Sequence, residues 1–406
     1  MHHSSDTQEP TEDVLTKSLF HKVLVMFHTP AEWSTWRMVL VDLFLTSLVV
    51  LAWWLTSSDF TLAIVAGLVF LAISMLDGLI LWSLPRRGLS FGSWQAQGIV
   101  LAISRLAACI ALSLAAAITS DLWSLLGLIV IQFIGLAALV WGAMIEPFNI
   151  QLTTLTITSD RILPGAKPVR VIHISDLHVE RLTKREEKLL ELIEETDADL
   201  ILLTGDYLNL SFIRDRKAQA EVKKLLSKLR APHGVYAVLG SPPVDERDVV
   251  PGLFEDLPIK LLVDQRQTVP IGEDRRLSLI GMDCTHNLPL DSHRLEILTN
   301  DMPNDVPSIL MYHAPDLFPE AVDLGIDLYL CGHTHGGQVR LPWIGALLTS
   351  SQLGRKYQMG LYQEGRTSMY VSRGVGMEGL SAPRVRFLSP PEITLVTITG
   401  KDPGSS

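Results

Sequence analysis

Four long apolar runs dominate the first third of the chain. They cover residues 38–57, 60–84, 95–118 and 122–145, and each is close to the roughly 20 residues that cross a bilayer as a helix. The first run follows a polar segment, and no small-residue cleavage pattern precedes the other runs, which argues against a cleaved signal peptide. We therefore predict four membrane-spanning helices.

The pattern changes after Pro147, where short β-rich runs alternate with longer charged helical patterns. This alternation is typical of a layered α/β or α+β domain. We predict helices over 184–195 and 215–229, and strands over 171–175, 199–204, 234–239, 277–281, 308–312, 327–331, 369–372 and 392–398. The predicted organisation is a polar, disordered N-terminal segment (1–34), a four-helix transmembrane domain (35–146) and a soluble domain (147–406).

Composition and charge agree with this division. The chain of 406 residues is 48% hydrophobic and 19% charged, and residues 1–146 hold only 6 of its 34 Lys and Arg. The formal net charge of −10 argues against nucleic acid as a partner, because phosphate neutralisation requires a surplus of basic residues. Cys109, Cys284 and Cys331 are odd in number and widely spaced, which excludes a disulfide framework and a Cys-rich zinc site.

Basic residues predict the orientation of the membrane helices, because Lys and Arg are retained on the cytoplasmic side. The loops around Ser58 and Ser120 contain no basic residue. The other flanks contain Lys17, Lys22, Arg37, Arg86, Arg87, Arg161, Lys167 and Arg170. All these flanks fall on one side if both termini and the soluble domain are cytoplasmic.

Three charged residues, Asp42, Asp77 and Arg105, lie inside the predicted spans. A pair between Arg105 and a carboxylate would reduce the cost of placing either charge in the membrane. Such a pair would either fix helix packing, which we favour, or line a path for a lipid headgroup.

Polar residues that can bind metal recur where the predicted strands of the soluble domain end. Open α/β sheets place their sites at such strand ends, and mixed carboxylate and imidazole ligands suit divalent transition metals. Each motif is weak alone, but four strand ends together deliver Asp176, His178, Asp206, His313, His333 and His335. We interpret this set as a metal site.

The soluble domain resembles the calcineurin-like metallophosphoesterase superfamily, most closely its bacterial membrane-associated branch of the YkuE/YaeI type. The matching stretches are Ile174-Ser-Asp-Leu-His178, Thr204-Gly-Asp-Tyr207, Gly234-Val-Tyr-Ala-Val-Leu-Gly240, His313-Ala-Pro-Asp316, Cys331-Gly-His-Thr-His-Gly-Gly-Gln338 and Ser372-Arg-Gly-Val-Gly376. The resemblance covers nearly all of residues 147–400. It implies a four-layer α/β domain, in which a β-sandwich is flanked by helices.

The resemblance also implies two divalent metal ions. Asp176, His178 and His335 would hold one ion, His313 and His333 the other, and Asp206 would bridge them. A hydroxide held between the ions would attack a phosphate ester or phosphoanhydride. The ligand types do not distinguish Mn, Fe, Zn or Ni. The implied partners are a phosphorylated small molecule or lipid substrate and the lipid bilayer of a bacterial inner membrane.

The third motif departs from the family pattern of Gly-Asn-His. The chain reads Gly240-Ser241-Pro242, so Ser241 occupies a metal-ligand position and Pro242 the position of the catalytic His. Proline has no side-chain donor and no N–H, and we therefore assign no catalytic acid.

Three interpretations of this departure compete. In the first, the enzyme is active, with Ser241 or a water completing the second metal shell, and the acid role is absent or taken by Asp245, Glu246 or His286. The second is a weakened or one-metal enzyme. The third is an inactive pseudoenzyme that binds or senses a phosphorylated ligand at the membrane. We favour retained hydrolysis, because the six other ligand positions persist.

Loss of the acid has a consequence for substrate choice. General acid catalysis contributes about 10²- to 10⁴-fold and matters most for poor leaving groups. We therefore expect nitrophenyl phosphodiesters or nucleotide-diphosphate lipids to be cleaved far better than alkyl phosphomonoesters. The region after the last glycine-rich motif also holds Arg373, Arg384 and Arg386, which either contact phosphate or have structural roles. We interpret His173 and His233 as structural.

Overall fold

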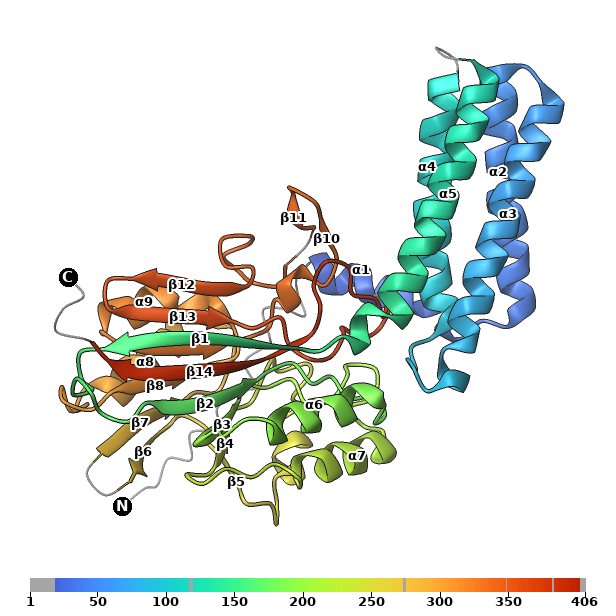
Figure 1. Ribbon diagram of the computed structural model, residues 1–406. Coiled ribbons are helices and arrows are strands. Elements are labelled where there is room, and N and C mark those ends of the chain that lie inside the picture. The colour runs from blue at the N-terminus through green and yellow to red at the C-terminus, as the bar shows by residue number, and fades with distance from the viewer. Residues whose placement is uncertain (1–18, 117–119, 273–274, 348, 382, 402–406) are drawn as a thin grey trace, which may run out of the picture.

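The computed structural model describes residues 19–116, 120–272, 275–347, 349–381 and 383–401 (Figure 1). Four of its helices, taken with the short turns that extend two of them, are long and apolar enough to cross a membrane: Thr35–Ser57, Phe60–Arg87, Trp94–Ala116 and Asp121–Phe148. This finding confirms the predicted spans and indicates a membrane protein. Residues 117 and 118, which the third predicted span included, lie outside the described part of the chain.

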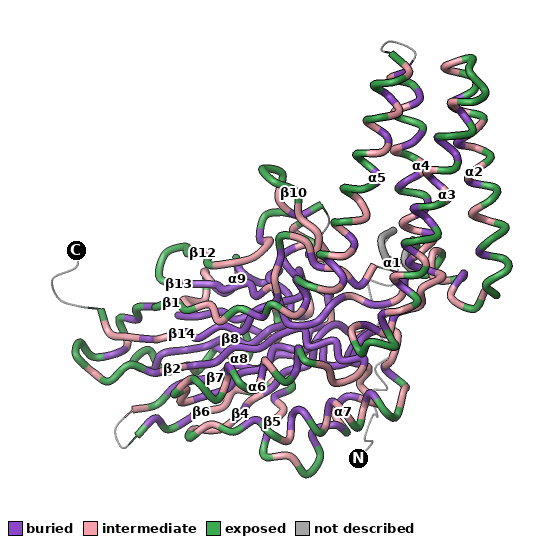
Figure 2. The backbone as a smooth tube through the Cα atoms, turned by 45° about the vertical axis from the view of Figure 1, so that its right-hand side comes forward, coloured by how far each residue is buried: buried purple, intermediate pink, exposed green. Residues whose placement is uncertain are grey.

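The four spans, α2 (Thr35–Ser57), α3 (Phe60–Ser83), α4 (Trp94–Ala116) and α5 (Asp121–Met144), form an up-and-down bundle (Figure 1). Exposed green segments mark its outer surface in Figure 2, where large apolar side chains such as Leu55 and Trp123 are each 71% exposed. Such a surface suits contact with lipid rather than water.

The segment before the bundle differs from expectation. Helix α1 (Leu19–His28) and a 3-10 turn (Thr29–Glu32) occupy part of residues 1–34, which the sequence suggested to be disordered. The reason is an apolar run from Leu19 to Phe27, interrupted only by His21 and Lys22, which the polar average of the whole segment concealed.

A buried ion pair lies inside the bundle. Arg105 Nε is 2.5 Å and Nη2 is 2.9 Å from the two carboxylate oxygens of Asp77. Arg105 Nη1 also donates to the Gln132 side chain at 2.7 Å, whereas Asp42 accepts from Ser74 at 2.9 Å. The predicted carboxylate partner is thus Asp77. Because these contacts join α3, α4 and α5, they favour the packing interpretation.

The domain that follows the bundle contains two six-stranded sheets. The first has the order β1 (Gln151–Ser159), β14 (Glu392–Gly400), β2 (Val169–Ile174), β3 (Leu200–Leu203), β4 (Val235–Ala237) and β5 (Ile259–Leu261). The second has the order β12 (Gly360–Glu364), β13 (Thr367–Val371), β9 (Leu328–Cys331), β8 (Ser308–Met311), β7 (Arg275–Gly281) and β6 (Gln265–Ile271). A small hairpin, β10 (Arg340–Leu341) and β11 (Gly345–Ala346), stands apart.

The two sheets pack face to face and are covered by helices on their outer faces. One core cluster joins the inner faces and includes Val171 and Leu202 of the first sheet and Leu279 and Leu330 of the second. A second cluster lies under α6 (Lys184–Glu194) and α7 (Arg216–Leu226), and a third under α8 (Leu288–Thr299) and α9 (Phe318–Asp323). This arrangement confirms the expected four-layer fold.

Local sequence explains where α6 and α7, the helices that cover the first sheet, begin. Thr183 and Glu186 form a capping box at the start of α6, in which each side chain satisfies a backbone N–H of the other residue. The Asp215 side chain caps α7 by accepting from Ala218 N at 2.8 Å.

The bundle is joined to the domain that follows it by hydrogen bonds at the lower end of the bundle in Figure 1. Arg386 N donates to the Gly142 carbonyl of α5 at 2.9 Å. The Glu146 carboxylate accepts from Trp141 Nε1 at 2.6 Å, from Leu388 N at 3.1 Å and from Ser389 N at 2.6 Å. The last span thus holds the loop that precedes β14.

Candidate metal centre

Parallel pairing brings the chemistry-bearing loops together. In the first sheet, Ile174 of β2 pairs with Leu203 of β3, which pairs with Ala237 of β4. In the second sheet, Met311 of β8 pairs with Leu330 of β9. Within each sheet the carboxyl ends of these strands therefore lie side by side. The two sets of ends come together where His313, after β8, lies 3.2 Å from Asp206, after β3.

The first group of candidate ligands consists of Asp176, His178 and His335, all buried. His178 Nε2 is 3.0 Å from His335 Nε2, and His335 Nε2 is 3.5 Å from Asp176 Oδ1. Ligand atoms of one small divalent cation lie about 3 Å apart, because each metal–ligand bond is about 2 Å long. The donor set therefore fits such an ion.

The second group consists of Asp206, His313 and His333, also buried. Asp206 Oδ2 is 3.2 Å from His313 Nε2 and 3.5 Å from His178 Nε2 of the first group. The Asp206 carboxylate thus lies between the two groups, where a bridging ligand would lie. Ser241 Oγ is 3.3 Å from His333 Nδ1 and borders the second group.

The remaining ring nitrogens of two histidines have partners that suit metal ligands. His313 Nδ1 is 2.7 Å from the Thr204 carbonyl, and His333 Nε2 is 3.2 Å from the Ser350 carbonyl. A ring N–H donated to a carbonyl leaves the other ring nitrogen unprotonated in the neutral imidazole. His313 Nε2 and His333 Nδ1 are therefore the atoms available to a cation.

Backbone conformation marks the site as well. Five of the candidate ligands have a positive φ: Asp176 (51°), His178 (40°), Asp206 (57°), His333 (68°) and His335 (51°). This conformation is uncommon for residues with a Cβ and tends to cluster at functional sites. His286 shares it, with a φ of 57°.

Two glycines allow the loops to approach the carboxylates. A Cβ on Gly332 would lie 2.0 Å from Asp176 Oδ2, and one on Gly240 would lie 2.1 Å from Asp206 Oδ1. No real side chain fits at these distances, so glycine is required there for steric reasons.

The charges at the centre are strongly interdependent. Burial would raise the pKa of Asp206, but the imidazoles of His313, His178 and His333 hold it below its usual range. Burial would likewise lower the pKa of His313, yet the Asp206 and Asp176 carboxylates raise it to about 9. Positive charge is therefore favoured between these carboxylates, as a metal site requires.

The three residues that could replace the missing acid, Asp245, Glu246 and His286, have different surroundings. Asp245 accepts from three backbone N–H groups and faces the loops rather than the metal groups. Glu246 pairs with Arg214 at 2.5 Å near the surface. His286 is buried, and its Nε2 lies 3.1 Å from Ser241 Oγ. Among the described contacts, His286 is the one of these three residues whose side chain packs against a side chain of the metal groups, that of His333.

His286 is only a weak candidate from the sequence, because it lies outside the third motif. The signal that could have identified it was present but weak. Cys284-Thr-His286 follows strand β7, at the same edge of the sandwich as the other candidate ligands. The ring centroid of His286 is 4.9 Å from that of His333.

The three arginines near the end of the domain have structural partners. Arg373 pairs with Glu392 at 2.6 Å, and Arg384 pairs with Glu180 at 2.9 Å. Arg386 is fully buried and donates to the carbonyls of Gly376 and Ser389 at 3.0 Å each. These contacts favour the structural interpretation over phosphate binding.

The two histidines that we interpreted as structural lie away from the metal groups. His173 is buried in β2, with Nε2 2.8 Å from Thr204 Oγ1. The His233 backbone N–H donates to the Asp199 carbonyl at 2.9 Å, in the turn before β4.

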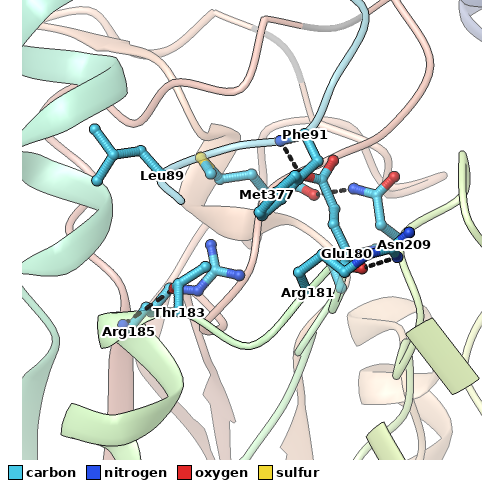
Figure 3. A pocket seen from close by; sticks show the side chains of 9 residues that line it. Leu89, Phe91, Glu180, Arg181, Thr183, Arg185, Asn209 and Met377 are labelled. Carbon is cyan, nitrogen blue, oxygen red and sulfur yellow. Dashed lines mark hydrogen bonds between the residues drawn. The ribbon is translucent and has the colours of Figure 1, made fainter. Parts of the chain in front are cut away.

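A pocket lies where the bundle meets the metal centre (Figure 3). Leu89 and Phe91, from the connection between α3 and α4, form one wall. His178 and Met377, from the domain that contains the two sheets, also line it. Phe91 N donates to the Glu180 carboxylate at 2.8 Å, and this hydrogen bond joins the two domains. A candidate metal ligand is therefore adjacent to a segment of the membrane domain.

Fold and site together define a metallophosphoesterase. A family model described as calcineurin-like phosphoesterase matches residues 169–337. The chain is 32% identical to the uncharacterized metallophosphoesterase YkuE of Bacillus subtilis, over 64% of this chain and 88% of that protein. The chain therefore belongs to the calcineurin-like phosphoesterase family, a family of phosphoric ester hydrolases.

Two further relatives have named activities. The phosphodiesterase YaeI of Escherichia coli is 28% identical, over 58% of this chain and 83% of that protein. The UDP-2,3-diacylglucosamine pyrophosphatase LpxG of Chlamydia muridarum is 24% identical, over 63% of this chain and 92% of that protein. These relatives support the YkuE/YaeI branch.

Proposed function

We propose that the protein is a membrane-anchored phosphoesterase with two metal ions, held by Asp176, His178 and His335 on one side and by His313 and His333 on the other. The position of Asp206 between the two groups carries this proposal, because one carboxylate within 3.5 Å of a histidine from each group can bridge two cations. When bound, such ions polarise the phosphoryl group and lower the pKa of a coordinated water.

Other residues of the chain orient this centre. The carbonyls of Thr204 and Ser350 hold the His313 and His333 rings, and Ser241 offers a hydroxyl where the family has an asparagine. His286 holds that hydroxyl through its contact at 3.1 Å. We propose that Ser241 completes the second metal shell and that His286 is its positioning residue.

The proposed substrate is a phosphodiester or phosphoanhydride with a good leaving group, carried on a membrane lipid. The lack of a proton donor at Pro242 supports the choice of leaving group. The four apolar helices and the pyrophosphatase activity named for LpxG support a lipid substrate. The preference for a good leaving group is tested by comparing the hydrolysis of bis-nitrophenyl phosphate and of an alkyl phosphomonoester by one preparation. Equal turnover of the two substrates would contradict it.

A second candidate function is phospholigand binding without turnover, which the proline at position 242 favours. Metal content and hydrolysis by the full chain in detergent discriminate between the two functions. Asp206→Asn should lose both bound metal and activity, whereas Asp248→Asn, on an exposed loop, should keep both. Less than one tightly bound metal per chain, with a rate unaffected by Asp206→Asn, would refute the enzyme proposal.

We also propose that both termini and the catalytic domain are cytoplasmic, in a bacterial inner membrane. The turn with Arg86 and Arg87 is at the same end of the bundle as the catalytic domain (Figure 1), in agreement with the retention of basic residues on the cytoplasmic side. Digestion of the domain by protease added to intact spheroplasts would contradict this orientation.

A further inference from the structure

The small hairpin β10–β11 presents an unusual group of apolar side chains. Trp343 at its turn is 103% exposed, Ile344 is 55% exposed, Leu347 is 48% exposed and Leu341 is 38% exposed. We call these four residues the hairpin tip. Exposed apolar residues are ordinary when scattered singly, but a contiguous group marks an interaction surface.

The rest of the described catalytic domain has no comparable group. Its other exposed large apolar residues are separated in sequence: Leu163, Val263, Ile297, Leu361 and Leu388. The hairpin tip, in contrast, contributes four such side chains within seven residues. Folding alone does not require this exposure, since the hairpin makes its own backbone pairs between Arg340 and Ala346 and between Leu341 and Gly345.

The direction of the hairpin identifies what covers it. In Figure 1 the hairpin projects from the catalytic domain toward the same side as the four spans, and Figure 2 shows the same direction after a turn of 45°. Helix α1 runs between the hairpin and the bundle in Figure 1, and its Val25 and Met26 are 49% and 60% exposed. The bilayer crossed by the spans would thus extend over α1 and reach the hairpin tip.

The chemistry of the hairpin fits a membrane surface. Tryptophan is enriched at the boundary between headgroups and acyl chains. Two cations lie beside the tip, because Arg340 directly precedes it and Arg355 reaches it from the following loop. Arg355 donates to the Ile344 carbonyl, which holds its charge beside the tip. Cations around an inserted apolar group suit anionic lipid headgroups.

The hairpin is also connected directly to the metal centre. Arg340 Nη1 donates to the Gly336 carbonyl at 2.7 Å, within the motif that supplies His333 and His335. After the hairpin, Ser350 Oγ donates to the His333 carbonyl at 2.6 Å, and its own carbonyl lies 3.2 Å from His333 Nε2. A force on the hairpin therefore acts on the loops that hold two candidate ligands.

We propose that the hairpin tip inserts into the leaflet next to the catalytic domain and forms a second membrane contact of the protein. This inference rests on the membrane anchoring in the proposed function and deepens it. With the anchor on one side and the hairpin on the other, the metal centre is held at the level of the lipid headgroups. The phosphate that it meets is one at the bilayer surface.

The test uses the full chain in nanodiscs that contain anionic phospholipid. Ile344→Cys is labelled with an environment-sensitive fluorophore, and Leu163→Cys is the matched control, because Leu163 is 80% exposed on the loop between β1 and β2. The three native cysteines are buried and should not react, which the unsubstituted protein verifies. The measurement is quenching by spin labels on the lipid acyl chains.

Insertion to a depth of about 5–10 Å should give a blue-shifted emission and at least about twofold quenching for the label at position 344, with neither effect at position 163. Water-like emission at 344, or equal quenching at both positions, would overturn the proposal. A blue shift at 344 without lipid quenching would indicate a protein partner and would also overturn it. Hydrolysis of a soluble nitrophenyl phosphodiester, measured in the same nanodiscs, reports separately on the proposed function.

Discussion

Asp245→Asn should destabilise the metal centre although Asp245 contacts no metal. Its Oδ2 accepts from Asp206 N at 2.8 Å and from Gly240 N at 2.7 Å, and its Oδ1 accepts from Tyr207 N at 3.0 Å. An asparagine offers only one acceptor oxygen. If that oxygen keeps the two bonds of Oδ2, the buried N–H of Tyr207 faces an NH₂ group instead of an acceptor.

Leaving one buried donor unsatisfied costs about 1–3 kcal/mol. For a domain of this size each kcal/mol shifts the melting temperature by about 2–4 °C, so Asp245→Asn should melt roughly 2–12 °C lower. Asp245→Ala removes all three acceptor contacts and should lose more than the asparagine variant. Bound metal should fall in both, because Asp206 and Gly240 define the loops around the proposed bridge.

Thermal unfolding followed by near-ultraviolet circular dichroism, in detergent with and without a chelator, separates loss of stability from loss of metal. Asp248→Asn is the control, since its side chain is 65% exposed and its contact with Arg214 lies at the surface. A wild-type melting temperature and metal content for Asp245→Asn would refute the reasoning.

Three further predictions follow from particular contacts. Pro242→His should raise turnover of alkyl phosphomonoesters by about 10²-fold or more, with little change for nitrophenyl substrates; a uniform change in steady-state rates would contradict it. His286→Ala should weaken binding of the second metal by about 10- to 100-fold by releasing Ser241, as measured by metal titration; unchanged affinity would argue against a positioning role. Arg105→Met should destabilise the bundle by about 3–5 kcal/mol, because Asp77 is left buried without its partner. The double variant with Asp77→Leu should recover most of that loss in thermal unfolding, and a double variant as unstable as the single one would contradict this account.

Sequence patterning predicted the elements that are most buried. Strands β3 and β9 are continuous apolar runs, and β2 and β8 are largely apolar. Each of the four was predicted within two residues at either end. Strand β1 was not predicted, because it is an edge strand with four threonines and only two buried residues among its nine. Strand β6 was also not predicted; it lies at the edge of the second sheet and contains Pro270, which weakens the strand pattern.

The part of the candidate site that could be predicted consists of residues that directly follow strands. Asp176, Asp206 and His313 could be placed because parallel strands share an edge, and the structure brings them together. The positioning role that we propose for His286 depends on its contact with Ser241, 45 residues earlier in the chain. No local pattern encodes such a contact, since it arises only when the two sheets pack.

Hydrogen bonds connect the membrane helices to the candidate metal centre, so the bundle supports the site as well as anchoring the domain. The Gly142 carbonyl of α5 accepts from Arg386 N, and the Glu146 carboxylate accepts from the backbone of Leu388 and Ser389. Ser389 Oγ in turn donates to the carbonyl of His335 at 2.8 Å. Without the bundle, the backbone N–H groups of Arg386, Leu388 and Ser389 would lose their protein acceptors, and the loop beside a candidate metal ligand would lose its support. Because the same loop region lies near the hairpin, the position of the protein in the bilayer and the geometry of the site are mechanically coupled. If the substrate is a membrane lipid, as we propose, it meets a centre that the membrane domain itself helps to shape.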